Sequence, residues 1–85
     1  MAVDKVKQIA DYLDSLAEDN SIPRNIRKGA ADAKTKLLNT SEAMDVRATS
    51  AIVILDELAN DPNIPLHGRT MIWNVISQLE TISRS

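Results

Sequence analysis

The chain has 85 residues and no cysteine, and its 12 acidic side chains outnumber its 10 lysines and arginines, for a formal net charge of −2. This length fits one domain over residues 1–85, and the lack of cysteine excludes disulfides, thiolate metal sites and thiol catalysis. A net negative charge is untypical of a dedicated nucleic-acid binder. With no Phe, one Trp, two Gly and three Pro, the composition favours closely packed helices over a sheet.

The chain also lacks the marks of a membrane or exported protein. Its longest uninterrupted apolar run, residues 51–55, is too short to cross a bilayer. Charges at Asp4 and Lys5 replace the apolar region of a signal peptide. We therefore expect a soluble cytoplasmic protein with no membrane partner.

The first helix is expected at about residues 2–19, where apolar side chains recur at three- and four-residue steps on one face. They are Val6, Ile9, Leu13 and Leu16. A polar turn follows, and Ser21 is expected to cap a second helix at about residues 23–39. Pro23 suits the first turn of that helix, where its missing N–H is not needed. The buried face of this helix is expected to contain Ile26, Ala30, Ala33 and Leu37.

The second half predicts another helix pair. A third helix is expected at about residues 42–59, capped by Ser41, and Val53 and Ile54 are expected to widen its buried arc. Residues 60–65 contain two prolines and three Asn or Asp residues, which predict a firm turn. The fourth helix, at about residues 65–82, has an apolar face formed by Ile72, Val75, Ile76, Leu79 and Ile82.

The two halves repeat one pattern. Shifted by 42 residues, residues 13–27 match residues 55–69 at eight of fifteen positions, as L-D-x-L-A-x-D-x-[SN]-I-P-x-x-x-R. Each copy reads as helix, turn, helix. Short connections favour antiparallel neighbours, so the sequence predicts an all-α, four-helix up-and-down bundle. A HEAT-like stack of helix pairs is the alternative, although stacked repeats usually need three or more units.

Each copy places an Asp before its turn and an Arg eight residues later, as Asp19 with Arg27 and Asp61 with Arg69. We expect a structural role, in which each Asp pairs with an Arg of either copy or accepts backbone N–H groups at the turn. The alternative is an anion site, because helix N-termini carry partial positive charge. Its donors would come from Arg24, Arg27, His67 and Arg69.

Signals for catalysis, metals and cofactors are weak. His67 is the only histidine, and without a nucleophile motif we expect a surface or capping residue. Trp73 is expected to anchor in the core or a groove, and a protein interface is its alternative. Asp56 and Glu57 are adjacent and so point apart on a helix, which argues against a metal site. We expect no enzyme, no cofactor and no metal.

Three segments carry a resemblance. Residues 46–52, residues 55–73 with the string D-P-N-x-P-x-H-x-R-T-x-I-W, and the motif at residues 23–27 resemble a family of short archaeal proteins described as uncharacterised. The likeness covers nearly the whole chain. It implies a four-helix fold and an archaeal cytoplasm, and it assigns no activity and no functional residues.

The leading hypothesis is therefore a non-enzymatic module that binds a protein partner or forms a homo-oligomer. The alternative is RNA or ribosome association through the basic second helix, by phosphate contacts. Its residues are Arg24, Arg27, Lys28, Lys34 and Lys36. That helix lacks interleaved aromatics, so a solvated face beside acidic neighbours is the preferred interpretation. An enzyme hypothesis is confined to a phosphate-ester site around His67 and Arg69.

Overall fold

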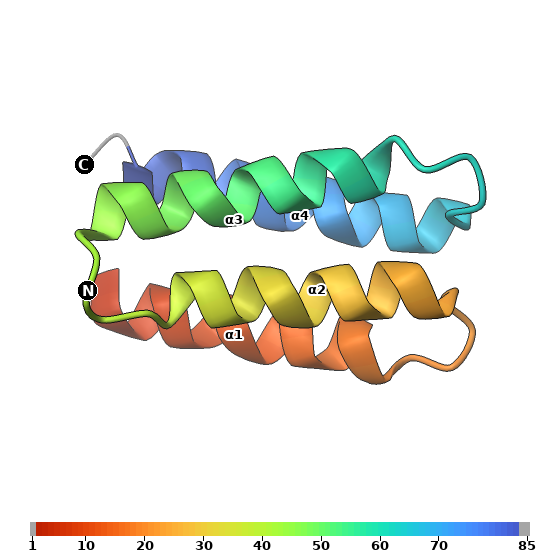
Figure 1. Ribbon diagram of the computed structural model, residues 1–85, viewed down its shortest axis with the longest axis horizontal. Coiled ribbons are helices and arrows are strands. Elements are labelled where there is room, and N and C mark those ends of the chain that lie inside the picture. The colour runs from red at the N-terminus through yellow and green to blue at the C-terminus, as the bar shows by residue number, and fades with distance from the viewer. Residues whose placement is uncertain (1, 84–85) are drawn as a thin grey trace.

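The computed structural model describes residues 2–83 as four α-helices joined by short turns. They are α1 (Ala2–Glu18), α2 (Arg24–Leu37), α3 (Met44–Ala59) and α4 (Leu66–Ser83). Successive helices run antiparallel, so the α1–α2 and α3–α4 turns share one end of the molecule and the α2–α3 turn lies at the other (Figure 1). The body measures 32 × 19 × 19 Å. It is the all-α four-helix bundle that the sequence predicts.

The helices close into a ring. Each helix packs on the next along the chain, and α1 also contacts α4. A HEAT-like stack would leave its first and last helices apart, so the α1–α4 contact distinguishes the bundle from that alternative. This closing contact is the least extensive of the four.

The core is built from small and branched aliphatic side chains. Leu13, Leu16, Ile26, Leu55 and Ile72 are fully buried, and no buried position of the described residues is polar or charged. Between α2 and α3 the packing uses small residues, including Ala30, Ala33, Ala48 and Ala51. Small side chains let two helix backbones approach closely, which explains how a chain without Phe fills its interior.

Gly29 of α2 lies against the side chain of Leu58 of α3. A β-carbon added at Gly29 would lie 2.5 Å from Cδ2 and 2.9 Å from Cγ of Leu58 on α3. Neither distance is compatible with van der Waals contact. The glycine therefore provides the space that the Leu58 side chain occupies.

The start of α1 and the end of α3 match the expected positions, and the other helix ends differ from them by one or two residues. Ser21 and Ser41 are not N-caps: α2 and α3 are preceded by Pro23 and Ala43, and neither makes a side-chain capping bond. The serine hydroxyls instead donate within the turns, Ser21 to Asp19 and Ser41 to Asn39, each at 2.6 Å. These bonds hold residues 19–21 and 39–41 in turns, so α1 and α2 end earlier than expected.

Two apolar side chains expected in the interior lie at the surface. Val53 on α3 and Trp73 on α4 are each 55% exposed. Ile54 is half-buried. The buried residues of α3 are Ala48, Ala51, Leu55 and Ala59, which define a face from which Val53 points away. An apolar helix sequence does not by itself reveal which side its neighbours cover.

Candidate functional site

The three turns between helices share one hydrogen-bond pattern. In each, a side-chain Oδ1 accepts the backbone N–H two residues later, which is an Asx turn. Asp19 accepts from Ser21 at 2.9 Å, Asn39 from Ser41 at 3.1 Å, and Asp61 from Asn63 at 2.8 Å. The backbone N–H three residues after each Asx residue also returns to its carbonyl oxygen. The Asx turn therefore occurs three times, at residues 19, 39 and 61, whereas the internal repeat in the sequence contains only the first and the third.

An arginine follows each Asx residue by eight positions and lies in the first turn of the next helix. Nε of Arg47 donates to the carbonyl oxygen of Leu37 at 2.7 Å, and Nε of Arg69 donates to that of Ala59 at 3.1 Å. Both acceptors are the last residue of the preceding helix, where carbonyls lack an intrahelical partner. These arginines therefore join consecutive helices.

Arg27 departs from this pattern. Its Nε is buried and has no hydrogen-bond partner among the described residues. One terminal nitrogen, Nη1, instead donates to Oδ1 of Asn20 at 3.4 Å. No Asp–Arg ion pair within 4.0 Å occurs among residues 5–83, whose side chains the structure describes. The expected Asp–Arg pairing is wrong, and the expected alternative, an Asp that accepts backbone N–H groups, is confirmed.

At the shared end of the bundle, the α1–α2 and α3–α4 turns bind each other through corresponding positions. Asn25 of α2 donates from Nδ2 to Oδ2 of Asp61 at 2.7 Å. His67 stands 42 residues after Asn25 and reaches the other turn, where its Nε2 lies 3.7 Å from Oδ2 of Asp19 and 3.1 Å from Oγ of Ser21. Asn25 of the first half therefore contacts Asp61 of the second half, and His67 of the second half contacts Asp19 of the first.

The direction of these bonds bears on the enzyme hypothesis. The Ser21 hydroxyl gives its single proton to Asp19, so Nε2 of His67 must be the donor toward Ser21. A Ser–His nucleophile pair needs the opposite direction, with the imidazole accepting the hydroxyl proton. The two hydrogen bonds from Ser21 have the largest effects and lower the pKa of Asp19. Burial opposes them, and the charges of His67 and Arg27 lower the pKa by smaller amounts. Ser21, His67 and Arg27 therefore stabilise the ionised carboxylate of Asp19.

The residues proposed for an anion site have separate environments. Arg69 bonds to the end of α3, and its guanidinium carbon lies 5.9 Å above the centre of the exposed Trp73 ring. His67 bonds to the α1–α2 turn, while Arg24 and Lys28 are exposed on α2. Within residues 5–83, the part of the chain with described side chains, no cluster of three or more His, Cys, Asp or Glu residues able to hold a metal occurs.

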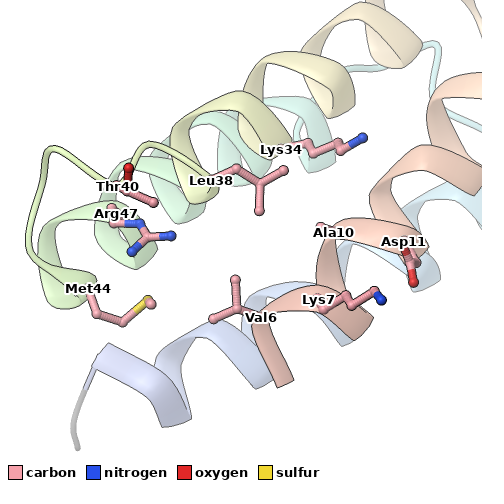
Figure 2. A pocket seen from close by; sticks show the side chains of 9 residues that line it. All are labelled: Val6, Lys7, Ala10, Asp11, Lys34, Leu38, Thr40, Met44 and Arg47. Carbon is pink, nitrogen blue, oxygen red and sulfur yellow. The ribbon is translucent and has the colours of Figure 1, made fainter. Parts of the chain in front are cut away.

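A groove at the other end of the bundle was not expected from the sequence. It lies where the start of α1, the end of α2 and the start of α3 meet, and has a volume of about 430 Å³ (Figure 2). Its lining comprises Val6, Lys7, Ala10, Asp11, Lys34, Leu38, Thr40, Met44 and Arg47. We call this the basic groove, because three of its lining side chains are cations and one is an anion.

The basic groove combines an apolar interior with charged ends. Figure 2 shows Val6, Leu38 and Met44 pointing into the same space, with Arg47 beside Met44 and Lys7 at the opposite side. Val6 is almost fully buried, whereas Leu38 is 44% exposed. The charges come from three segments far apart in the sequence, so no local motif could have revealed the groove.

Comparison with known proteins identifies the chain's relatives. The model of a family described as "Uncharacterised protein family (UPF0147)" matches residues 2–82. The chain belongs to the UPF0147 family. The resemblance to a family of short archaeal proteins is thereby confirmed.

Individual UPF0147 relatives align along most of the chain. A UPF0147 protein of Thermoplasma volcanium is 44% identical over 87 residues, covering 100% of this chain and 98% of its own. One of Methanosarcina acetivorans is 51% identical over 77 residues, covering 91% of this chain and 79% of its own. Their descriptions state no activity.

Solved structures show the same fold. A crystal structure described as that of unknown function protein MMP1188 has a TM-score of 0.94 at 45% identity, covering 96% of this chain and 93% of that chain. A UPF0147 protein from Thermoplasma acidophilum has a TM-score of 0.90 at 42% identity, covering 94% of each chain. In the part of this UPF0147 chain that the model describes, no helix is long and apolar enough to cross a membrane.

Proposed function

We propose that this UPF0147 protein is a non-enzymatic, cytoplasmic protein-binding module whose docking site is the basic groove. The observation that carries the proposal is an open apolar groove of about 430 Å³ formed by three helices of a small bundle. Clefts between helices with an apolar lining and a few polar groups are common binding sites. Leu38 at its edge is a large apolar side chain left 44% exposed.

The opposite end of the bundle supports the same proposal by its chemistry. There the polar side chains satisfy one another: Asp19 accepts from Ser21, and Asp61 accepts from Asn25 and Asn63. The Ser21 hydroxyl donates to Asp19, which supports a structural role for Ser21 and His67 over a Ser–His nucleophile pair. The enzyme hypothesis centred on His67 and Arg69 has less support, because both side chains already bond within the bundle.

The RNA alternative has less support. Lys34 is paired with Asp14 at 2.7 Å, and Arg27 is directed to Asn20 in the α1–α2 turn. Arg24, Lys28 and Lys36 are the exposed cations of α2, and Asp32 is exposed on the same helix. Binding of the pure protein to bulk RNA that survives about 0.2 M salt would favour this alternative over the protein-binding module.

Site-specific photo-crosslinking in an archaeal host tests the proposal. A photoreactive amino acid is placed at Leu38 in one strain and at Val46 in another, because both side chains are 44% exposed and only Leu38 lines the basic groove. The proposal expects one discrete protein adduct from position 38, identified by mass spectrometry, and none from position 46. Equal adducts from both positions, or none from either, would contradict it.

A further inference from the structure

The charges around the basic groove identify the chemistry of its occupant. Resting on the proposed function, we infer that the partner presents a short segment in which Asp or Glu residues flank apolar side chains. Three features of the groove point to this occupant: cations without a close counter-charge, their position on either side of the apolar interior, and the extension of the groove along α2.

Among residues 5–83, two of the three lining cations have no carboxylate oxygen within 4.0 Å, and the groove's own anion, Asp11, lies one helical turn after Lys7. Lys34 is satisfied, because its Nζ lies 2.7 and 2.8 Å from the two oxygens of Asp14. Lys7 is exposed, and among residues 5–83, whose side chains the structure describes, no carboxylate oxygen lies within 4.0 Å of its Nζ. Arg47 uses Nε for the Leu37 carbonyl, which leaves its terminal N–H groups available in the groove (Figure 2). This local excess of positive charge contrasts with the net charge of −2 of the whole chain.

The positions of these two cations define a pattern. Figure 2 places Arg47 beside Met44 at one side of the basic groove and Lys7 at the other, with Val6 and Leu38 between them. A carboxylate can bind a guanidinium through two parallel hydrogen bonds, and a second carboxylate can meet a lysine ammonium as a point charge. The complementary ligand therefore has an apolar centre and an acidic group on either side.

The shape favours a length of polypeptide over a compact ligand. Lys34 and Leu38 also line a shallower depression of about 620 Å³, which continues the groove along α2. The remaining lining residues of that depression are Asp14, Ala31, Thr35 and Asn39. A segment that fills the basic groove can extend into this depression without a change in the fold.

Selection from a library of random 12-residue peptides displayed on phage tests the inference on the full-length protein. Parallel selections use Leu38→Asp, which places a carboxylate in the groove, and Val46→Asp, the control of equal exposure on the outer side of α3. We expect enriched peptides with Asp or Glu beside Leu, Ile, Val or Phe. We also expect affinity to fall about tenfold in Leu38→Asp and less than twofold in Val46→Asp.

A charge exchange on one enriched peptide tests the cations directly. Replacing its acidic residues by Asn and Gln should weaken binding about tenfold at low salt, with a smaller ratio at 0.5 M salt because of screening. Lys7→Glu should weaken binding of the acidic peptide and strengthen binding of a version in which Lys replaces its acidic residue nearest position 7. Lys7 is exposed, so this change leaves the core intact.

The results separate this inference from the proposed function. Enriched peptides without an acidic excess that still lose affinity in Leu38→Asp overturn the inference and keep the groove as a docking site. Peptides that bind Leu38→Asp as well as the unchanged protein overturn both. If the unchanged protein is a dimer by light scattering and Leu38→Asp is a monomer, the occupant is a second copy, and the inference is again overturned.

Discussion

Nε of Arg47 donates a hydrogen bond to the carbonyl oxygen of Leu37, ten residues earlier, over 2.7 Å. Leu37 is the last residue of α2, and helix C-termini combine unpartnered carbonyls with partial negative charge. One side chain thus provides both a hydrogen bond and a positive charge at that end. Arg69 does the same for Ala59 at the end of α3, at 3.1 Å.

The contrast among the three arginines gives the first prediction. Arg47→Met and Arg69→Met should each lower the free energy of unfolding by about 1–2 kcal/mol, because each leaves a terminal carbonyl without its charged donor. Arg27→Met should cost clearly less, since Nε of Arg27 has no partner to lose among the described residues. Urea denaturation of the three variants measures the difference. Equal losses would mean that the arginines stabilise the bundle by packing alone.

The second prediction concerns the pKa of Asp19. The Ser21 hydroxyl, then the Ser21 backbone N–H, and then the charges of His67 and Arg27 lower this pKa below its ordinary value of 3.8. Ser21→Ala removes the largest of these effects and should raise the pKa toward 3.8. Carboxyl ¹³C chemical shifts followed through an acid titration measure it. An unchanged pKa would show that the hydroxyl bond is absent in solution.

The third prediction concerns how the stability of the protein depends on pH through the lowered pKa of Asp19. Because the pKa of Asp19 is lower in the folded chain, the unfolded chain binds the proton more readily, and acid favours unfolding. The stabilisation by Asp19 is complete above the ordinary carboxyl pKa and is lost as pH falls through the folded value. Asp19→Asn should keep the turn, as Asn39 does in the α2–α3 turn, and lack this pH dependence. Its unfolding free energy should therefore approach that of the unchanged protein as pH falls.

The fourth prediction uses the close approach of α2 and α3. Alanine is about 1 kcal/mol better than glycine inside a helix, yet Gly29→Ala would place a β-carbon 2.5 Å from Leu58. We expect the clash to dominate and Gly29→Ala to destabilise by about 1–3 kcal/mol. In a Leu58→Ala background the clash is gone, and the same change should be neutral or stabilising. A double-mutant cycle by thermal unfolding checks this reversal of sign.

Periodicity and turn residues predicted the four helices, because apolar spacing determines which face of each helix is buried. Leu13, Leu16, Leu55 and Leu79 lie in the core as expected. The helix ends were less predictable, since Ser21 and Ser41 have two possible partners each, a helix N-terminus or a nearby Asx side chain. Only the turn geometry decides between them.

The candidate site was less accessible from sequence than the fold. The Asx–Arg spacing of Asn39 and Arg47 was present in the sequence, but the surrounding residues differ from the other two copies, and the comparison by identity missed it. The basic groove depends on how far α1 stands from α3, which no local pattern encodes. Lys7 and Arg47 lie 40 positions apart and meet one groove only through the fold.

The last prediction concerns Val53 on α3, which the sequence predicts to be buried and the structure places at the surface. Leu55 is fully buried, so Leu55→Ala should cost about 2–5 kcal/mol through lost packing and a residual cavity. Val53 is 55% exposed, so Val53→Ala should be neutral or stabilise by about 0.5 kcal/mol, because alanine is the better helix former. Chemical denaturation at two protein concentrations, tenfold apart, measures both variants. A loss above about 1 kcal/mol in Val53→Ala that grows with protein concentration would mean that another copy covers this face of α3 in solution.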